Sequence, residues 1–192
     1  MYLESSSVPP MPDYIDSDRL VLRPPRMGDG AMINEAIRES FPELSRWMPW
    51  ARHMPSIPES ETFAREAAAR FRTREELPLL IIRKKDGLYL GSTGMHNINW
   101  EVPRFEIGYW IRTSMSGHGY MTEAVKALTA FTFETLNAVR MEIRCDSRNE
   151  RSAAVARRAG YTLEAKLKWE GRDNDGGLRD TLIFCKLRDD GV

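Results

Sequence analysis

The chain of 192 residues contains few cysteines, no excess of either charge and no long apolar segment. Its two cysteines, Cys145 and Cys185, are too few for the disulfide framework of a small secreted domain or for a cysteine-rich metal site, so we expect no metal. The 28 basic residues balance the 28 acidic ones, which removes the usual electrostatic basis for binding nucleic acid or an anionic membrane. No apolar run approaches the roughly 20 residues that span a bilayer.

These absences predict a cytoplasmic protein with neither nucleic-acid nor membrane partners, and we expect a monomer or a homodimer. The remaining composition, 42% hydrophobic and 29% charged, is typical of a folded globule, and the length fits one domain. Residues 1–15 are rich in serine and proline and predict a flexible tail. Residues 16–192 are then expected to form a single domain.

The spacing of apolar residues predicts a mixed α+β domain. A period of two predicts seven strands, at 19–23, 79–83, 88–97, 105–112 and 139–145 and on either side of a turn at 174–177. A period of about 3.6 predicts helices that begin near residue 29 and that cover 60–74, 120–137 and 152–159. Residues 41–58 carry four prolines and are expected to form a loop or a broken helix.

The segment that says most about function is the tight turn at 114–119, between a strand and the longest helix. The run Ser-Met-Ser-Gly-His-Gly presents several unpaired main-chain N–H groups at the positive end of the helix dipole, which suits a phosphate or pyrophosphate. Gly117 and Gly119 permit the turn and the close approach of a ligand, although many such turns merely connect two elements. Tyr120 after Gly119 excludes a Walker loop, and Thr122 in place of a third glycine excludes the dinucleotide fingerprint.

The order of several motifs along the chain resembles that of a known enzyme superfamily. FEIGYWI at 105–111 is followed by SGHGYMTEAVKAL at 116–128 and RMEIRCD at 140–146, and then by Asn149-x-x-Ser152 and Ala159-Gly160-Tyr161. This arrangement resembles the GNAT superfamily of acetyl-CoA-dependent N-acetyltransferases, and within it the ribosomal-protein N-terminal acetyltransferases of the RimJ/RimL type. The resemblance extends over about residues 19–188.

The resemblance implies an α+β fold with a mixed, mostly antiparallel seven-stranded sheet, helices on both faces and a cleft where the fourth and fifth strands splay apart. Acetyl-CoA is the implied cosubstrate, and its pantetheine arm would pair with the main chain near Ile111 and Arg112. Its pyrophosphate would lie on the turn and the first residues of the helix, with Asn149 reaching it from the other side. The implied residues of that turn are Gly117, His118, Gly119, Tyr120 and Met121. The superfamily often has Gln or Arg where this chain has Ser114.

Acetyl transfer requires a neutral amine, and an α-amino group with a pKa near 8 needs only a weak base at neutral pH. Glu106 is the first candidate, because an extended strand places Glu106, Gly108 and Trp110 on one face. The alternative is that Glu106 is a solvated strand residue or an ion-pair partner, and His96 is a second possible base.

Departure of the CoA thiolate requires a proton, and many members of the superfamily supply it from a tyrosine at the position that Ala156 occupies here. The RimJ/RimL resemblance points instead to Ser152, which is equally suited to cap the helix that follows.

Trp47 and Trp50 are expected to pack and to border the acceptor site. The leading function is therefore transfer of acetyl from acetyl-CoA to a protein N-terminus by direct attack in a ternary complex. The alternatives are an acetyltransferase for a small-molecule amine, such as a polyamine, an antibiotic or an amino-acid-like toxin, and a CoA-binding module without catalysis.

Overall fold

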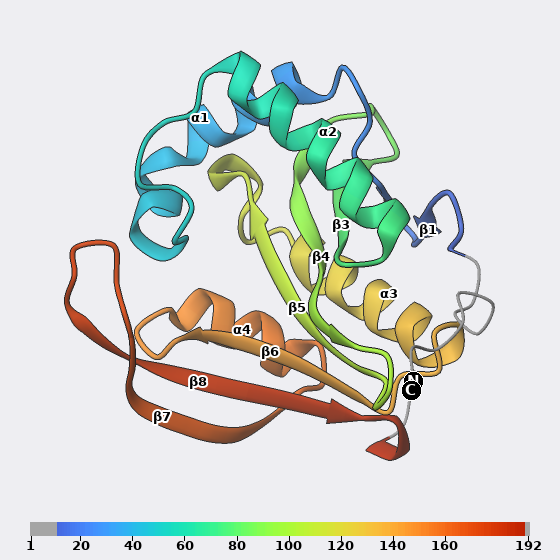
Figure 1. Ribbon diagram of the computed structural model, residues 1–192, viewed down its shortest axis with the longest axis vertical. Helices are drawn as coiled ribbons and strands as arrows, with labels where there is room; N and C mark the ends of the chain where they lie inside the picture. The colour runs from blue at the N-terminus through green and yellow to red at the C-terminus, as the bar shows by residue number, and fades with distance from the viewer. Residues whose placement is uncertain (1–10, 191–192) are drawn as a thin grey trace.

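The computed structural model describes residues 11–190 and consists of one sheet flanked by helices (Figure 1). The strands are β1 (Ile15–Asp16), β2 (Leu20–Arg23), β3 (Leu77–Arg83), β4 (Tyr89–Asn99), β5 (Arg104–Ile111), β6 (Arg140–Asp146), β7 (Thr162–Arg172) and β8 (Leu178–Leu187). The helices are α1 (Gly30–Trp47), α2 (Ile57–Thr73), α3 (Tyr120–Glu134) and α4 (Glu150–Arg158), with short 3₁₀ turns at Thr113–Met115 and Arg188–Asp190.

The strand order in the sheet is β1-β2-β3-β4-β5-β6-β8-β7, and every neighbouring pair is antiparallel except β5 and β6, which are parallel. The mixed, mostly antiparallel sheet is thus confirmed, with eight strands in the described residues where seven were predicted. The additional strand is β1, in which buried Ile15 pairs with Leu22. Ile15 is the last residue of the tail predicted over 1–15, of which residues 1–10 lie outside the described part.

Helices cover both faces of the sheet, as predicted. Strand β3 divides its side chains between the two faces: Leu79 and Ile81 belong to the larger core with α3 and α4, whereas Leu80 packs with α1 and α2. The smaller core also contains Trp110 at its edge, so one face of β5 looks toward α1 and α2. The alternation of β5 therefore sorts its residues between two distinct environments.

Two helix boundaries differ from the prediction. Helix α1 continues through Pro42 to Trp47, because Leu44 completes the buried face that begins with Ile33 and Ile37, and this packing outweighs the lost main-chain hydrogen bond. Helix α2 begins at Ile57, three residues before the predicted start, because Ser56 and Glu59 form a reciprocal capping box.

Strand β7 is an outer strand whose residues are mostly exposed, including Trp169 at 74%. Its pairing with β8 is interrupted by register shifts at Leu163/Ala165 and Leu167/Gly171. No helix in the described part of the chain combines the length and apolar character needed to cross a bilayer.

Candidate active site

The site lies where the parallel strands β5 and β6 separate (Figure 1). Their pairing begins at Arg104↔Arg140 and ends at Ile107↔Ile143, although β5 continues to Ile111. The N–H of Arg112 donates to Leu90 on β4 at 2.7 Å, so even-numbered residues of β5 bond toward β4. By the same alternation, the main-chain groups of Tyr109 and Ile111 face the gap that β6 leaves. The splay implied by the superfamily resemblance is therefore present.

One side of the splay opens into a cavity of about 830 Å³ between β5, β6 and the starts of α3 and α4, which we call the coenzyme cleft. Most of the residues predicted to bind the cofactor line it: Ile111, Gly117, Gly119, Tyr120, Met121 and Asn149. One cavity thus collects predicted cofactor residues from position 111 to position 149 of the sequence.

The turn before α3 is suited to a diphosphate. Gly119 is the N-cap of α3 at φ 79°, and no side chain caps the helix, so the N–H groups of the first turn have no side-chain acceptor. Gly117 has φ 83°, and a Cβ built on it would have no atom within 4 Å, so the outer side of the turn is open. Main-chain donors at a helix N-terminus form an anion site, and here they line the coenzyme cleft.

Two of the predicted cofactor residues do not line the cleft. The guanidinium of Arg112 is buried and pairs with Glu39 at 2.7 Å and with Glu35 at 3.0 Å, and its main-chain N–H is already bonded to β4. Glu39 also accepts from the N–H and hydroxyl of Ser114, so this cluster anchors the turn to α1. His118 is exposed, and its ring stacks beside Tyr120 with 6.0 Å between centroids.

The other side of the splay opens into a second cavity of about 770 Å³, which we call the acceptor pocket. It lies between α1, α2 and β4 on one side and the hairpin of β7 and β8 on the other, and its lining includes Trp47, Trp50, Glu106 and Trp110. Trp50 and Trp110 pack with their ring centroids 6.2 Å apart. Trp47 lines both cavities, as do Tyr109 and Cys145, so the two cavities meet at the splay.

Glu106 lies in the acceptor pocket with its side chain 14% exposed. Its Oε1 is 3.2 Å from Nε2 of His96, and its Oε2 accepts from Nδ2 of Asn97 at 2.8 Å. Burial raises the pKa of the Glu106 carboxyl, but the hydrogen bonds from His96 and Asn97 outweigh burial, so the pKa lies below its ordinary value. Glu106 therefore has both the position predicted for a base and the contacts of an ion-pair partner.

Ser152 lines the coenzyme cleft, but it is not the N-cap of α4. The cap is Asn149, whose side chain accepts from the N–H of Ser152 at 3.0 Å, so the capping interpretation of Ser152 was wrong. The hydroxyl of Ser152 instead donates to Oη of Tyr109 at 3.1 Å, and Tyr109 donates to the Ser152 carbonyl at 2.9 Å. Burial raises the pKa of Tyr109, which keeps the phenol protonated. Tyr109 was missed, although the alternation of β5 placed it opposite Glu106.

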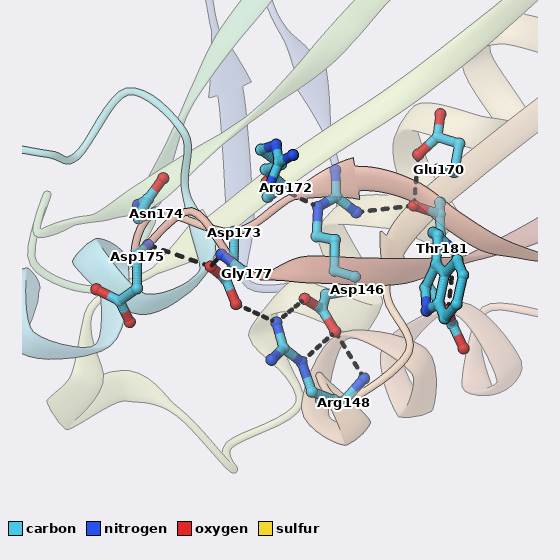
Figure 2. A network of polar contacts seen from close by, with 12 residues as sticks. Asp146, Arg148, Glu170, Arg172, Asp173, Asn174, Asp175, Gly177 and Thr181 are labelled. Carbon is cyan, nitrogen blue, oxygen red and sulfur yellow. Dashed lines mark hydrogen bonds and ion pairs between the residues drawn. The ribbon is translucent and has the colours of Figure 1, made fainter.

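The turn of the β7–β8 hairpin is fastened over the acceptor pocket. Nδ2 of Asn174 donates to the carbonyls of Ser45 and Met48, at 2.6 and 2.9 Å, and so ties the turn to the end of α1. Figure 2 shows a second attachment, in which Arg148 lies between Asp146 and Asp173. Neither attachment could be predicted from the sequence, which indicated only the turn at 174–177.

A splayed strand pair with a helix start suited to an anion on one side and a separate pocket on the other is an arrangement suited to a transferase that uses a coenzyme and an acceptor. Residues 19–162 match the Acetyltransferase (GNAT) domain family. The chain belongs to this family and is an acetyl-CoA-dependent N-acetyltransferase.

Individual relatives agree with this assignment. The chain is 30% identical over 166 residues to YdaF of Bacillus subtilis (strain 168), named as a candidate ribosomal N-acetyltransferase, covering 83% of this chain and 85% of that one. It is 29% identical to the ribosomal-protein-serine acetyltransferase of Escherichia coli (strain K12), covering 74% and 80%.

Solved structures show the same fold. RimL, a ribosomal L7/L12 α-N-protein acetyltransferase solved with coenzyme A, superposes with a TM-score of 0.85 at 23% identity, over 93% of this chain and 99% of that one. The microcin C7 self-immunity acetyltransferase MccE, solved with acetyl-CoA and AMP, superposes with a TM-score of 0.82 at 24% identity, over 89% and 93%.

Proposed function

We propose that the chain transfers the acetyl group of acetyl-CoA to the α-amino group of a protein N-terminus, in a ternary complex at the splay. The observation that carries this proposal is that two separate cavities meet at the same stretch of β5, with Glu106 in one and Ser152 in the other. Relatives named for ribosomal-protein acetylation support a protein acceptor.

The main chain performs most of the coenzyme binding in this proposal. The free groups of Tyr109 and Ile111 would pair with the pantetheine arm, as an added strand pairs with a sheet. The diphosphate would lie on the N–H groups between Gly117 and the first turn of α3. Acetyl-CoA supplies the activated carbonyl, and a main-chain N–H at the splay would stabilise the negative charge that develops on its oxygen.

Glu106 would remove the proton from the attacking amine, directly or through one water. Its lowered pKa makes the carboxylate a weak base, and a weak base suffices for an α-amine whose pKa is near 8. A carboxylate has about four acceptor sites, and His96 and Asn97 occupy two of them. Room therefore remains for the amine or for a water.

The Ser152–Tyr109 pair would supply the proton to the departing thiolate. Ser152 would give its proton to the thiolate once its hydroxyl turns from Tyr109 toward the sulfur. The Tyr109 hydroxyl, which donates to the Ser152 carbonyl and which burial keeps protonated, would then turn to return a proton to the serine oxygen. We expect Ser152→Ala and Tyr109→Phe each to lower kcat, and the double variant to fall no further than the more affected single one, because the two groups act as a unit.

A small-molecule amine is the second candidate acceptor, because a cavity of about 770 Å³ lined with tryptophan is of a size that holds small ligands. The deciding experiment measures CoA thiol release with acetyl-CoA against a panel of N-terminal peptides, the same peptides with acetylated N-termini, and small amines. We expect turnover of free peptides only. Turnover confined to a small amine would replace the protein acceptor, and CoA binding without any turnover would remove the enzymatic proposal.

A further inference from the structure

The acidic and basic side chains of the acceptor pocket differ in how many of them form ion pairs. Most of its carboxylates have a basic partner. Asp146 and Asp173 share Arg148, at 2.7 and 3.0 Å, as Figure 2 shows. Glu170 pairs with Arg144 at 3.0 Å. The remaining carboxylates of the lining also have partners, namely Glu59, Glu76 and Glu106. In the described lining only Glu59, which accepts from Ser56, and Glu106 lack an arginine or lysine partner, and Glu106 is the carboxylate assigned to the reacting amine.

Three arginines of the same lining, Arg46, Arg172 and Arg179, have no carboxylate oxygen within 4.0 Å among the residues that the structure describes. Arg46 lies over the ring of Trp47, with 4.6 Å from the guanidinium carbon to the ring centroid. Arg172 donates to a main-chain carbonyl of the hairpin turn at 2.7 Å. Arg179 donates to the hydroxyl of Thr181 at 2.8 Å. None of these contacts is an ion pair, although the Thr181 hydroxyl that accepts from Arg179 itself donates to Glu170 at 2.7 Å.

Arg179 is the best positioned of the three. It is half-buried, and its Nε donates to the Arg172 carbonyl at 3.3 Å, so two of its five N–H donors have partners. Its guanidinium lies over Gly171, where a Cβ would come within 3.1 Å of Nη2. The missing side chain at residue 171 thus makes room for the guanidinium beside the hairpin.

Arg172 and Arg179 lie on the β7–β8 hairpin and Arg46 lies on α1, and Asn174 attaches the turn of that hairpin to the end of α1. Arg46 and Arg172 are exposed, so they stand at the mouth of the acceptor pocket, whereas Glu106 is largely buried within it. An anion held by these arginines would therefore be separated from the reacting amine. In a peptide acceptor, an acidic side chain shortly after the N-terminal residue would be such an anion.

We propose that the acceptor is a peptide with an acidic side chain in the first few residues after the N-terminal residue that receives the acetyl group. Arg179, assisted by Arg172 and Arg46, would bind this acidic side chain. This inference rests on the proposed function. A guanidinium binds a carboxylate in a bidentate manner, and a site built for a charged group discriminates strongly against analogues that lack it.

The test compares kcat/KM for peptides that begin Ser-Ala-Asp, Ser-Ala-Asn and Ser-Ala-Lys and are otherwise identical. We expect the Asp peptide to exceed the Asn peptide about tenfold, and the Lys peptide to be poorest. Arg179→Gln should reduce the Asp/Asn ratio to below about twofold, and Arg46→Gln, on an exposed part of α1, should reduce it part of the way. Arg65→Gln, an exposed position of α2 outside both cavities, is the matched control and should leave the ratio and the activity unchanged.

Three results would overturn the inference. Equal turnover of the Asp and Asn peptides would remove the acidic preference and leave the proposed function standing. A preference that persists in Arg179→Gln and Arg46→Gln would assign it to other residues. If no peptide is acetylated but O-phosphoethanolamine is preferred over ethanolamine, the arginines recognise a phosphate on a small molecule, and the proposed protein acceptor fails as well.

Discussion

The coenzyme cleft and the acceptor pocket lie on opposite sides of one strand, yet they are built from different materials. The cleft presents main-chain groups at Tyr109, Ile111 and the glycine turn, whereas the pocket presents side chains from α1, α2, β4, β5 and the β7–β8 hairpin. A main-chain site depends on local conformation and tolerates many side chains. A side-chain site depends on which distant residues meet, and it can change its ligand while the coenzyme site stays constant.

The strongest test of this division of labour is Glu106→Gln. Loss of a general base typically lowers kcat by about 10²- to 10⁴-fold, and we expect a loss in that range with a KM for acetyl-CoA that changes less than about threefold. Steady-state kinetics with both substrates varied measures the two effects. A kcat near that of the wild type would leave Glu106 with a structural role in the His96 pair.

The pH profile tests the same carboxylate without mutation. The basic form of Glu106 exists above its pKa, which lies below the ordinary value of about 4.3, so the base is fully available at neutral pH and is lost only as the pH falls through that lowered value. We therefore expect kcat/KM for a peptide to rise about tenfold per pH unit until it levels near 8, the pKa of the α-amine. An inflection between pH 5 and 7 that His96→Gln abolishes would assign the base to His96.

Gly119→Ala tests whether the coenzyme site depends on main-chain conformation. A Cβ in the left-handed region costs roughly 1–2 kcal/mol and would stand where the diphosphate approaches, so we expect the Kd for CoA to rise about tenfold. Gly87→Ala is the matched control, because Gly87 has a similar φ of 72° in a turn outside both cavities. Calorimetric titration should show that the Gly87→Ala variant binds CoA with a Kd within about twofold of the wild type. Equal effects of both substitutions would indicate general destabilisation.

Asn174→Ala should have the smallest effect, confined to the acceptor side. The substitution removes two hydrogen bonds of about 1 kcal/mol each between the hairpin turn and α1. We expect the KM for the peptide to rise about three- to fivefold, with the KM for acetyl-CoA unchanged. Asp175→Ala, an exposed residue of the same turn, serves as control. A parallel rise in both KM values would show that the hairpin supports the whole splay.

The contrast between the two cavities also explains what the sequence could predict. The turn at Gly117 and Gly119 was predictable because its signal lies within a few consecutive residues, and the same holds for the strand and helix order. That three arginines line one pocket was not predictable, because it depends on how the β7–β8 hairpin attaches to α1. Spacing alone also could not show that Arg112 turns toward α1 and away from the cleft.

The local errors have identifiable causes as well. Asn149 and Ser152 both satisfy the residue preference of a helix cap, and only the geometry assigns the role to Asn149. Pro42 is a strong local signal against a helix, but burial of Leu44 overrides it. Strand β1 has two residues, too few for any periodicity to appear.

Strand β7 has a consequence beyond the reaction. An outermost strand with open N–H and C=O groups can serve as a template on which further copies stack into a fibril. The outer edge of β7 is a poor template for such stacking, because it carries lysines at 166 and 168 and its pairing with β8 is interrupted twice. Charge and local kinks both oppose the addition of a further strand. The long hairpin that borders the acceptor pocket can thus extend into solvent without promoting aggregation.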